Sequence, residues 1–135
     1  MAVALDDGLI TPVLQQANEH DIYSLGRSWK DLVAKAKDNR LTPEEYNSGT
    51  FMISNLGMYG VSQFDCLLPV GVGAILAIGS SVPTVVVQKN GFMGVQKQMT
   101  VTLAADHRHI YGADAAIFLK DLAELLEDGT DQLLL

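Results

Sequence analysis

The chain has 135 residues, of which 48% are hydrophobic, so it is long and apolar enough to fold as one globular domain. Its net charge of -7, with nine Lys and Arg residues, disfavours a nucleic-acid partner, because that affinity rests on basic side chains that neutralise phosphates. A single cysteine excludes an intrachain disulfide, and the longest apolar stretch, 66–79, is too short and too interrupted for a membrane span.

The first third of the chain is predicted to be extended at its start and helical afterwards. Residues 1–5 read as a strand that turns at 6–8 into a second short extended segment. Ser24 is the expected N-cap of a helix. The apolar residues that recur at helical spacing behind it are Leu25, Trp29, Leu32, Val33 and Ala36. A short helix follows, with Thr42 as its cap and Glu45 at the capping-box position.

The remainder is predicted to form strands and a final helix. Residues 50–54 are β-branched and aromatic, 74–79 are continuously apolar, and 84–88 are β-branched, so three separate strands are expected. Glycines at 91 and 94 mark a hairpin return to 98–106, where apolar residues alternate with threonines. A helix then runs from Gly112 to Gly129 with one apolar face. This order predicts a mixed α/β fold, a sheet with covering helices.

Titratable residues concentrate in "AADHRHIYGADAA", at the junction between the last strand and the last helix. On extended backbone, His107 and His109 would point to one side, and Asp106 or Asp114 could add oxygen ligands for a metal. The ligand set is thin, because the chain has no cysteine cluster and only one other histidine. No metal site is therefore predicted, and histidines satisfied by ordinary hydrogen bonds remain the alternative.

Other catalytic patterns carry less support. Cys66 is expected to be a small core residue, because no local pattern pairs it with a histidine. The glycines of 71–79 do not form a phosphate-binding loop, because they open a strand and lack the later Gly or Lys. His107 remains as a base of suitable pKa at a strand end, with Ser54 at another strand end as a hydroxyl donor to an oxyanion.

Four ordered stretches resemble the catalytic domain of the dihydrolipoamide acyltransferases, the E2 components of 2-oxo-acid dehydrogenase complexes. They are "VALDDGLITPVLQQA", "GTFMISNLGMYGV", "PVGVGAILAIG" and "DHRHIYGADAA", the last resembling the family's H-R-x-x-[D/N]-G signature. The resemblance spans essentially the whole chain. It implies a partial domain with the fold of chloramphenicol acetyltransferase, and homotrimers that assemble into cubic or dodecahedral cores.

The resemblance also implies an acyl transfer between a dihydrolipoyl group and coenzyme A. His107 takes the position of the catalytic base, and Ser54 that of the serine that a neighbouring subunit contributes to the oxyanion. Coenzyme A is a substrate, the lipoyl group is supplied by another domain, and no tightly bound cofactor is expected. The E1 and E3 components would bind through domains that this chain lacks.

Several residues receive specific expectations from the same resemblance. Tyr111 replaces the family's usual Asp or Asn four residues after the histidine and is placed in the catalytic site. Asn55 and Gly57 are expected to shape the turn that presents Ser54 to substrate. Asp106 and Arg108 should pair to order the loop, with Arg108 fixed by buried partners. Three C-terminal residues are expected to dock on a neighbouring trimer: Leu133, Leu134 and Leu135.

The extent and setting of the chain follow from this resemblance as expectations. Residues 1–135 correspond to the C-terminal portion of the catalytic domain, without the lipoyl domain and the peripheral-subunit-binding domain. The expected activity is acetyl transfer in a pyruvate dehydrogenase complex of the chloroplast stroma, with the mitochondrial matrix and the cytoplasm as alternatives. The alternative function is a catalytically inactive scaffold of such a core.

Overall fold

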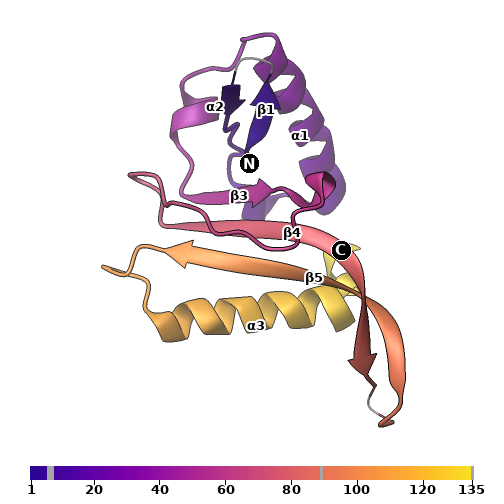
Figure 1. Cartoon of the computed structure of the whole chain (residues 1–135). Helices are drawn as coiled ribbons and strands as arrows, with labels where there is room; N and C mark the ends of the chain where they lie inside the picture. The colour runs from indigo at the N-terminus through magenta and orange to yellow at the C-terminus, as the bar shows by residue number, and fades with distance from the viewer. Residues whose placement is uncertain (6–7, 89, 135) are drawn as a thin grey trace.

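The computed structural model describes residues 1–5, 8–88 and 90–134. Strands β1 (Val3–Leu5) and β2 (Gly8–Ile10) form a small antiparallel sheet. The main sheet has the order β3-β4-β5, with β3 (Phe51–Asn55) parallel and β5 (Met93–Ala105) antiparallel to the central β4 (Ala74–Val87). Figure 1 shows α1 and the small sheet on the β3 side of the main sheet and α3 beside β5. The predicted fold class, a mixed sheet with covering helices, is confirmed.

Helix α1 (Ile22–Lys37) begins after Asp21, so the expected cap at Ser24 is wrong. The carboxylate of Asp21 accepts hydrogen bonds from the backbone N–H groups of Tyr23, at 2.9 Å, and Ser24, at 3.0 Å. These donors would otherwise be unpaired at the helix start. The Ser24 hydroxyl, followed by its backbone N–H, holds the pKa of Asp21 below its usual value. The expected apolar face is confirmed, with Leu32 and Ala36 buried.

A short helix, α2 (Glu44–Asn47), connects α1 to the main sheet. One carboxylate oxygen of Glu45 accepts from the Thr42 backbone N–H at 2.8 Å, as the capping-box pattern predicts. The other oxygen accepts from the Lys35 ammonium of α1 at 2.9 Å. The backbone N–H group of Ala2 donates to the carbonyl of Ile53 at 3.0 Å, which joins the start of the chain to β3.

The two strands expected at 74–79 and 84–88 are one strand, β4, so this part of the prediction is wrong. Its pairing with β5 slips between Ile78 and Ser81, where a bulge interrupts the ladder. At the bulge, the Ser80 N–H group donates to the carbonyl of Val61 at 2.8 Å. A Cβ at Gly79 would lie 2.0 Å from the Ser62 carbonyl oxygen, so only glycine fits beneath this loop.

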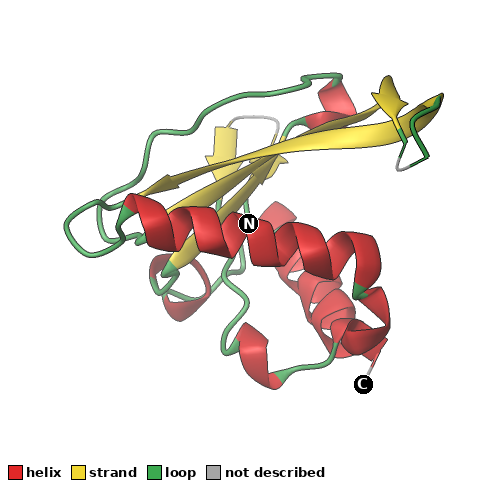
Figure 2. Ribbon diagram, turned by 90° about the horizontal axis from the view of Figure 1, so that it is seen from below, coloured by secondary structure: helices red, strands yellow, loops and turns green. Residues whose placement is uncertain are grey.

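Strand β5 returns along β4 and leads into the last helix, α3 (Gly112–Asp128), which ends at Gly129 as predicted. Figure 2, viewed from below, shows α3 lying across the strands of the main sheet. The side chains of its expected apolar face differ in burial, since Leu119 and Leu122 are half-buried and Leu126 is 47% exposed. A 3-10 helix, Thr130–Leu134, follows.

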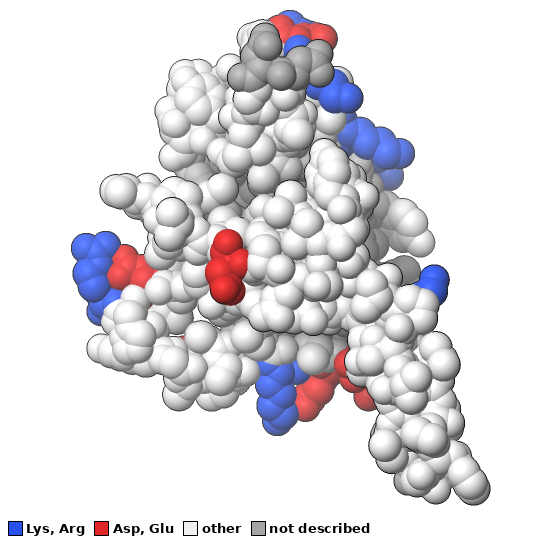
Figure 3. Space-filling model, in the orientation of Figure 1, with Lys and Arg blue, Asp and Glu red and all other residues white. Residues whose placement is uncertain are grey.

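The buried core is small and lies at one end of the main sheet. It comprises Leu32 and Ala36 of α1 and residues 74–77 of β4, all at most 6% exposed, beside a fully buried Pro12. The other end of the β4–β5 hairpin projects from the body, and the face of it seen in Figure 3 is largely uncharged. Among the described residues, no helix is both long and apolar enough to span a membrane.

Candidate functional site

The junction between β5 and α3 is a closed turn rather than extended chain. Asp106 donates its backbone N–H to the carbonyl of Gly73 at 2.9 Å, which fixes the start of the turn to the beginning of β4. Its own carbonyl accepts from the N–H groups of His109, at 3.2 Å, and Ile110, at 2.9 Å. The extended backbone considered above, which would point His107 and His109 to one side, is therefore not formed.

A clamp between Asp106 and Arg108 holds this turn from outside. The Oδ1 atom of Asp106 accepts from the backbone N–H of Arg108 at 3.1 Å and from its Nε at 2.9 Å. These side-chain and backbone bonds hold the pKa of Asp106 far below its usual range, and the carboxylate raises the pKa of Arg108. The expected pair is present. The expectation that buried partners fix Arg108 is wrong, because its partner Asp106 is only partly buried, with a side chain 15% exposed, and Arg108 itself is 89% exposed.

His107 lies at the tip of the turn and is exposed. Its ring meets the ring of Tyr111 with centroids 5.8 Å apart and planes at 74°, which is an edge-to-face arrangement. In the described part of the chain, no hydrogen bond reaches the imidazole nitrogens of His107. The ring is therefore held by an apolar contact while its nitrogens stay open to a substrate proton.

Tyr111 is anchored where α3 begins. It is the N-cap residue, with extended backbone angles of φ -86° and ψ 161°, and its N–H donates to the Asp114 carboxylate at 3.2 Å. Its carbonyl accepts from the N–H of Ala115 at 3.1 Å, within the first helical turn. Asp114, considered above as a metal ligand, therefore acts as a helix-capping residue. The pattern of an acidic residue three positions after the cap was the available signal for this role.

His109 belongs to the same turn but has a different environment. Its Nδ1 atom lies 3.9 Å from the Asp106 carboxylate, and its side chain is 59% exposed. A Cβ at Gly73 would lie 3.5 Å from its Nε2 atom, so this ring packs beside the start of β4. These contacts make His109 a neighbour of His107 that packs against the start of β4.

Ser54 lies on β3, just before a turn that its neighbours define. The Asn55 side-chain oxygen accepts from the backbone N–H of Gly57 at 2.9 Å, and the Leu56 N–H donates to the Ile78 carbonyl at 3.2 Å. A Cβ at Gly57 would lie 2.8 Å from the carbonyl oxygen of Gly79, so this position tolerates no side chain without a shift of β4. Asn55 and Gly57 thus shape the turn after Ser54, as expected.

Within one chain, the structure does not bring His107 and Ser54 together. Ala105, two residues before the histidine, aligns through β4 with Phe51 at the start of β3. Ser54 lies three residues further along β3, which is about 10 Å along the strands and about 10 Å across the two intervening strand spacings. The two side chains therefore lie on opposite edges of the three-stranded sheet and at different levels along its strands.

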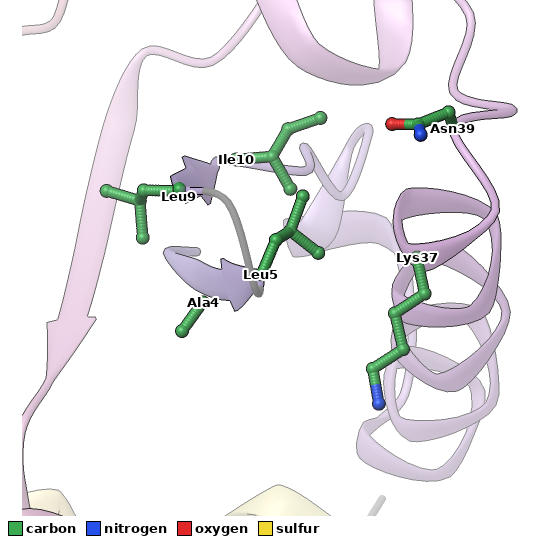
Figure 4. A pocket seen from close by; sticks show the side chains of 7 residues that line it. Ala4, Leu5, Leu9, Ile10, Lys37 and Asn39 are labelled. Atoms are coloured by element: carbon green, nitrogen blue, oxygen red, sulfur yellow. The ribbon is translucent and has the colours of Figure 1, made fainter.

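The other candidates assemble no catalytic group. Cys66 is half-buried. Across residues 1–5, 8–88 and 90–134, no three metal-binding side chains converge. Figure 4 shows a pocket between the β1–β2 hairpin and the end of α1, where Leu5 and Ile10 face Lys37 and Asn39. Among the described residues, Lys37 is the one ionisable group that lines it.

The expected assembly residues are only partly described. Leu133 is half-buried in the C-terminal 3-10 helix. The side chain of Leu134 and all of Leu135 lie outside the described residues. The sequence interpretation missed Gly73, whose carbonyl fixes the turn that carries His107, because no sequence pattern signals a contact between residues 33 positions apart.

Comparison with known proteins agrees over the whole length of the chain. Residues 1–135 match the family model for the 2-oxoacid dehydrogenases acyltransferase (catalytic domain). Component 5 of the chloroplastic pyruvate dehydrogenase complex of Arabidopsis thaliana, a dihydrolipoyllysine-residue acetyltransferase, is 59% identical over 131 residues, covering 97% of this chain. The corresponding acetyltransferase component of Rickettsia felis is 43% identical over 127 residues, 94% of this chain.

Solved structures give the same result for the fold. Dihydrolipoamide acetyltransferase of Azotobacter vinelandii aligns with a TM-score of 0.89 at 29% identity over 99% of this chain. The cubic core of a pyruvate dehydrogenase multienzyme complex aligns with a TM-score of 0.89 at 30% identity and the same coverage. This chain spans 54% of each of those structures, 28% of the Arabidopsis relative and 31% of the Rickettsia relative.

Proposed function

The chain belongs to the 2-oxoacid dehydrogenase acyltransferase family (catalytic domain), and from this premise we propose that it takes part in acetyl transfer between a dihydrolipoyl group and coenzyme A. The observation that carries the proposal is the turn after β5, which holds an exposed His107 with free ring nitrogens on a backbone fixed from both sides. A general base needs that combination of rigid support and open access.

The chemistry assigns one role to each of the two separated side chains. The thiol of coenzyme A has a reference pKa of about 8.5 and is mostly protonated at neutral pH. His107 removes that proton, and the thiolate attacks the thioester carbonyl of the S-acetyl-dihydrolipoyl group. The Ser54 hydroxyl donates to the oxyanion of the tetrahedral intermediate, an interaction typically worth about 3–4 kcal/mol. Collapse forms acetyl-coenzyme A, and the departing dihydrolipoyl thiolate recovers the proton from the His107 imidazolium.

The proposed site forms between two copies of the chain. His107 and Ser54 lie at opposite edges of one sheet, so a single copy leaves each without the other. A cyclic trimer lets the His107 edge of one copy face the Ser54 edge of the next, because head-to-tail contacts close into rings. The likeness to a cubic core supports assembly of such trimers into a larger particle, with Leu133–135 among the contacts.

The catalytic residues of the Azotobacter acetyltransferase support the same assignment. A serine, a histidine and an asparagine have a role in its catalytic mechanism, with the serine 52 residues before the histidine and the asparagine four residues after it. Here Ser54 precedes His107 by 53 residues, and Tyr111 follows it by four. The spacing after the histidine is thus the same, the spacing before it differs by one residue, and Tyr111 stands in place of the asparagine.

The setting of the reaction is proposed from the relatives. The chloroplastic acetyltransferases of Arabidopsis support a plastid location, in the stroma, and pyruvate-derived acetyl as the acyl group. Coenzyme A and the lipoyl group act as substrates, the lipoyl group being carried by another domain. The E1 and E3 components of the complex would be bound through other parts of the protein.

Complementation between copies tests this proposal directly. His107→Ala and Ser54→Ala subunits of the full-length protein are unfolded together, refolded together, and assayed for acetyl transfer from acetyl-coenzyme A to dihydrolipoamide. We expect each variant alone to be severely impaired. A mixture should form intact sites at about a quarter of its interfaces by random pairing, if the site lies between copies.

Controls separate the possible failures. Each variant refolded alone must give particles of the same mass as the mixture, so that assembly is not the variable. Mixed particles no more active than their parents would overturn the site between copies. Full activity of His107→Ala alone would overturn the histidine as the base, and equal inactivity of the unmodified protein would favour the scaffold.

A further inference from the structure

We propose that Tyr111 is a positioning residue for His107, and that it acts through its aromatic ring rather than through its hydroxyl group. The inference rests on the proposed function, because it deepens the role of the histidine as a base. It concerns the position at which the Azotobacter acetyltransferase has an asparagine. An amide side chain can orient a neighbouring imidazole only through hydrogen bonds, whereas a phenol ring can also orient it through an aromatic contact. Tyr111 can therefore position His107 in a way that asparagine cannot.

The backbone of His107 is fixed, but that alone does not orient its ring. Asp106 is bonded to Gly73, to the N–H groups that close the turn, and to Arg108. These bonds determine where the Cα atom of His107 lies. The side chain still has two rotatable bonds, and among the described residues no hydrogen bond restrains the imidazole. The remaining orientational restraint must come from a packing contact.

Tyr111 supplies that contact from a rigid element. The two ring centroids lie 5.8 Å apart with planes at 74°, within the range at which edge-to-face aromatic pairs are attractive. The tyrosine backbone is held by Asp114 and by the first turn of α3, a helix of 17 residues. The imidazole, although exposed, thus lies against the residue that begins α3. Its nitrogens are left unoccupied by the aromatic contact.

This arrangement explains how the chain dispenses with an amide at position 111. The Tyr111 side chain is largely exposed, at 60% for the residue, so its hydroxyl is not buried in a polar network. The ring contact restricts rotation of the imidazole without taking either nitrogen. A base that must accept a thiol proton and return it gains from that freedom, because neither nitrogen has to break a hydrogen bond first.

Three substitutions at the same position separate the ring from the hydroxyl. Tyr111→Phe keeps the ring and removes the hydroxyl, Tyr111→Leu keeps apolar bulk without the aromatic contact, and Tyr111→Asn introduces the amide of the Azotobacter protein. In the full-length assembled protein, we expect Tyr111→Phe to retain most of kcat. The Leu and Asn variants should lose about tenfold or more in kcat, since misorientation of a reacting group has effects of that size. The KM for coenzyme A should change little.

A chemical measurement independent of activity accompanies the kinetics. Diethyl pyrocarbonate acylates neutral imidazoles, and mass spectrometry reports the rate at each histidine separately. We expect His107 to react faster in Tyr111→Leu than in the unmodified protein or in Tyr111→Phe. His109, in the same turn, is the internal reference and should keep its rate, because its contacts are with Asp106 and the start of β4.

The outcomes distinguish this inference from the proposed function. Equal kcat values for the Phe and Leu variants, or an Asn variant as active as Phe, would overturn positioning by the ring. Parallel increases at His107 and His109 would indicate that the whole turn had loosened and would also overturn it. Full activity of His107→Ala would overturn the proposed function instead, while the pattern of acylation would still report whether Tyr111 shields and orients the ring.

Discussion

The two halves of the β4–β5 hairpin are made from the same pair of strands and have opposite surroundings. In the proximal half, residues 74–78 pair with 101–105, and Ala74, Ile75, Leu76 and Ala77 are at most 6% exposed. In the distal half, residues 81–87 pair with 93–99, and several apolar side chains are exposed to solvent. The turn that carries His107 follows the buried half, so the site is supported by the best-packed strand segment of the molecule.

The distal half carries apolar side chains on both faces of the ribbon. Val85 pairs with Val95 and Val87 with Met93, and these four side chains are 66–79% exposed on one face. The opposite face carries Val82 and Val86 beside the polar residues Thr84, Gln96 and Gln98. The comparison teaches that strand pairing alone does not bury a hairpin. Burial requires a covering element, which the proximal half has and the distal half lacks among the described residues.

The largest expected difference between the halves comes from truncating one apolar side chain in each. Leu76→Ala should lower the free energy of unfolding by about 2–5 kcal/mol, because it leaves a cavity in the packed core. The matched Val85→Ala should cost at most about 1 kcal/mol, the span of strand propensities, because Val85 is 66% exposed. Urea unfolding of the full-length protein measures both. Equal losses would show that another surface covers the distal half.

The boundary between the halves is a glycine that makes a close contact, and it offers a second test. At Gly79, an added Cβ would lie 2.0 Å from the backbone oxygen of Ser62. At Gly94, it would meet only the end of the flexible, exposed Gln88 side chain, at 2.3 Å. Gly79→Ala should therefore destabilise by about 1–3 kcal/mol or more, the usual cost of overpacking. Gly94→Ala should be nearly neutral, because Gln88 can turn away.

Thermal unfolding of the two glycine variants, alongside the unmodified protein, checks this difference. A destabilised Gly94→Ala with an unaffected Gly79→Ala would contradict the assignment of the bulge as the point where the 61–64 loop presses on the sheet. The hydrogen bond from Thr102 to the Phe64 carbonyl, at 2.6 Å, fixes the same loop, so the loop has limited freedom to withdraw.

The same hairpin shows what the sequence could and could not predict. The alternation of apolar residues and threonines predicted β5 from Gln98 onward but missed its first five residues, which include Gly94. The periodic leucines with Gly129 predicted α3, because these signals are local. β4 was predicted as two strands because glycine and proline usually interrupt strands. Here the interruption is a bulge that a loop from elsewhere in the chain stabilises, and Pro83 lies in the distal half.

The sequence could name candidate residues for the site, but it could not predict how they are arranged in space. The family resemblance selected His107, Ser54 and the Asp106–Arg108 pair; the pair is observed, and the catalytic roles of His107 and Ser54 stay predictions. The separation of His107 from Ser54 depends on the register of three strands, which no local pattern specifies. The prediction of the α1 cap was wrong for a simpler reason. Asp21 and Ser24 are both good N-cap residues, and the carboxylate of Asp21 accepts hydrogen bonds from two backbone N–H groups.

The smallest expected effect concerns the proximal end of the hairpin, where Asp106 anchors the turn. Hydrogen bonds from the Arg108 side chain and backbone hold the pKa of Asp106 well below its unfolded value of about 3.9. A carboxyl group with a lowered folded pKa contributes stability above the unfolded pKa and loses it as the pH falls toward the folded one. The stability difference between the unmodified protein and Asp106→Asn should thus be constant from pH 7 to about 5 and shrink below about pH 4.

Urea unfolding at a series of pH values from 7 to 3 measures that difference, and an exposed pair provides its control. Asp38 and Arg40 form an ion pair at 2.7 Å, but their side chains are 57% and 64% exposed, so Asp38→Asn should change stability little at any pH. If Asp106→Asn behaved like Asp38→Asn, the Asp106 clamp would be a surface contact without structural effect. The buried half of the hairpin would then end at Ala105, and the carbonyl of Gly73 alone would fix the turn beneath His107.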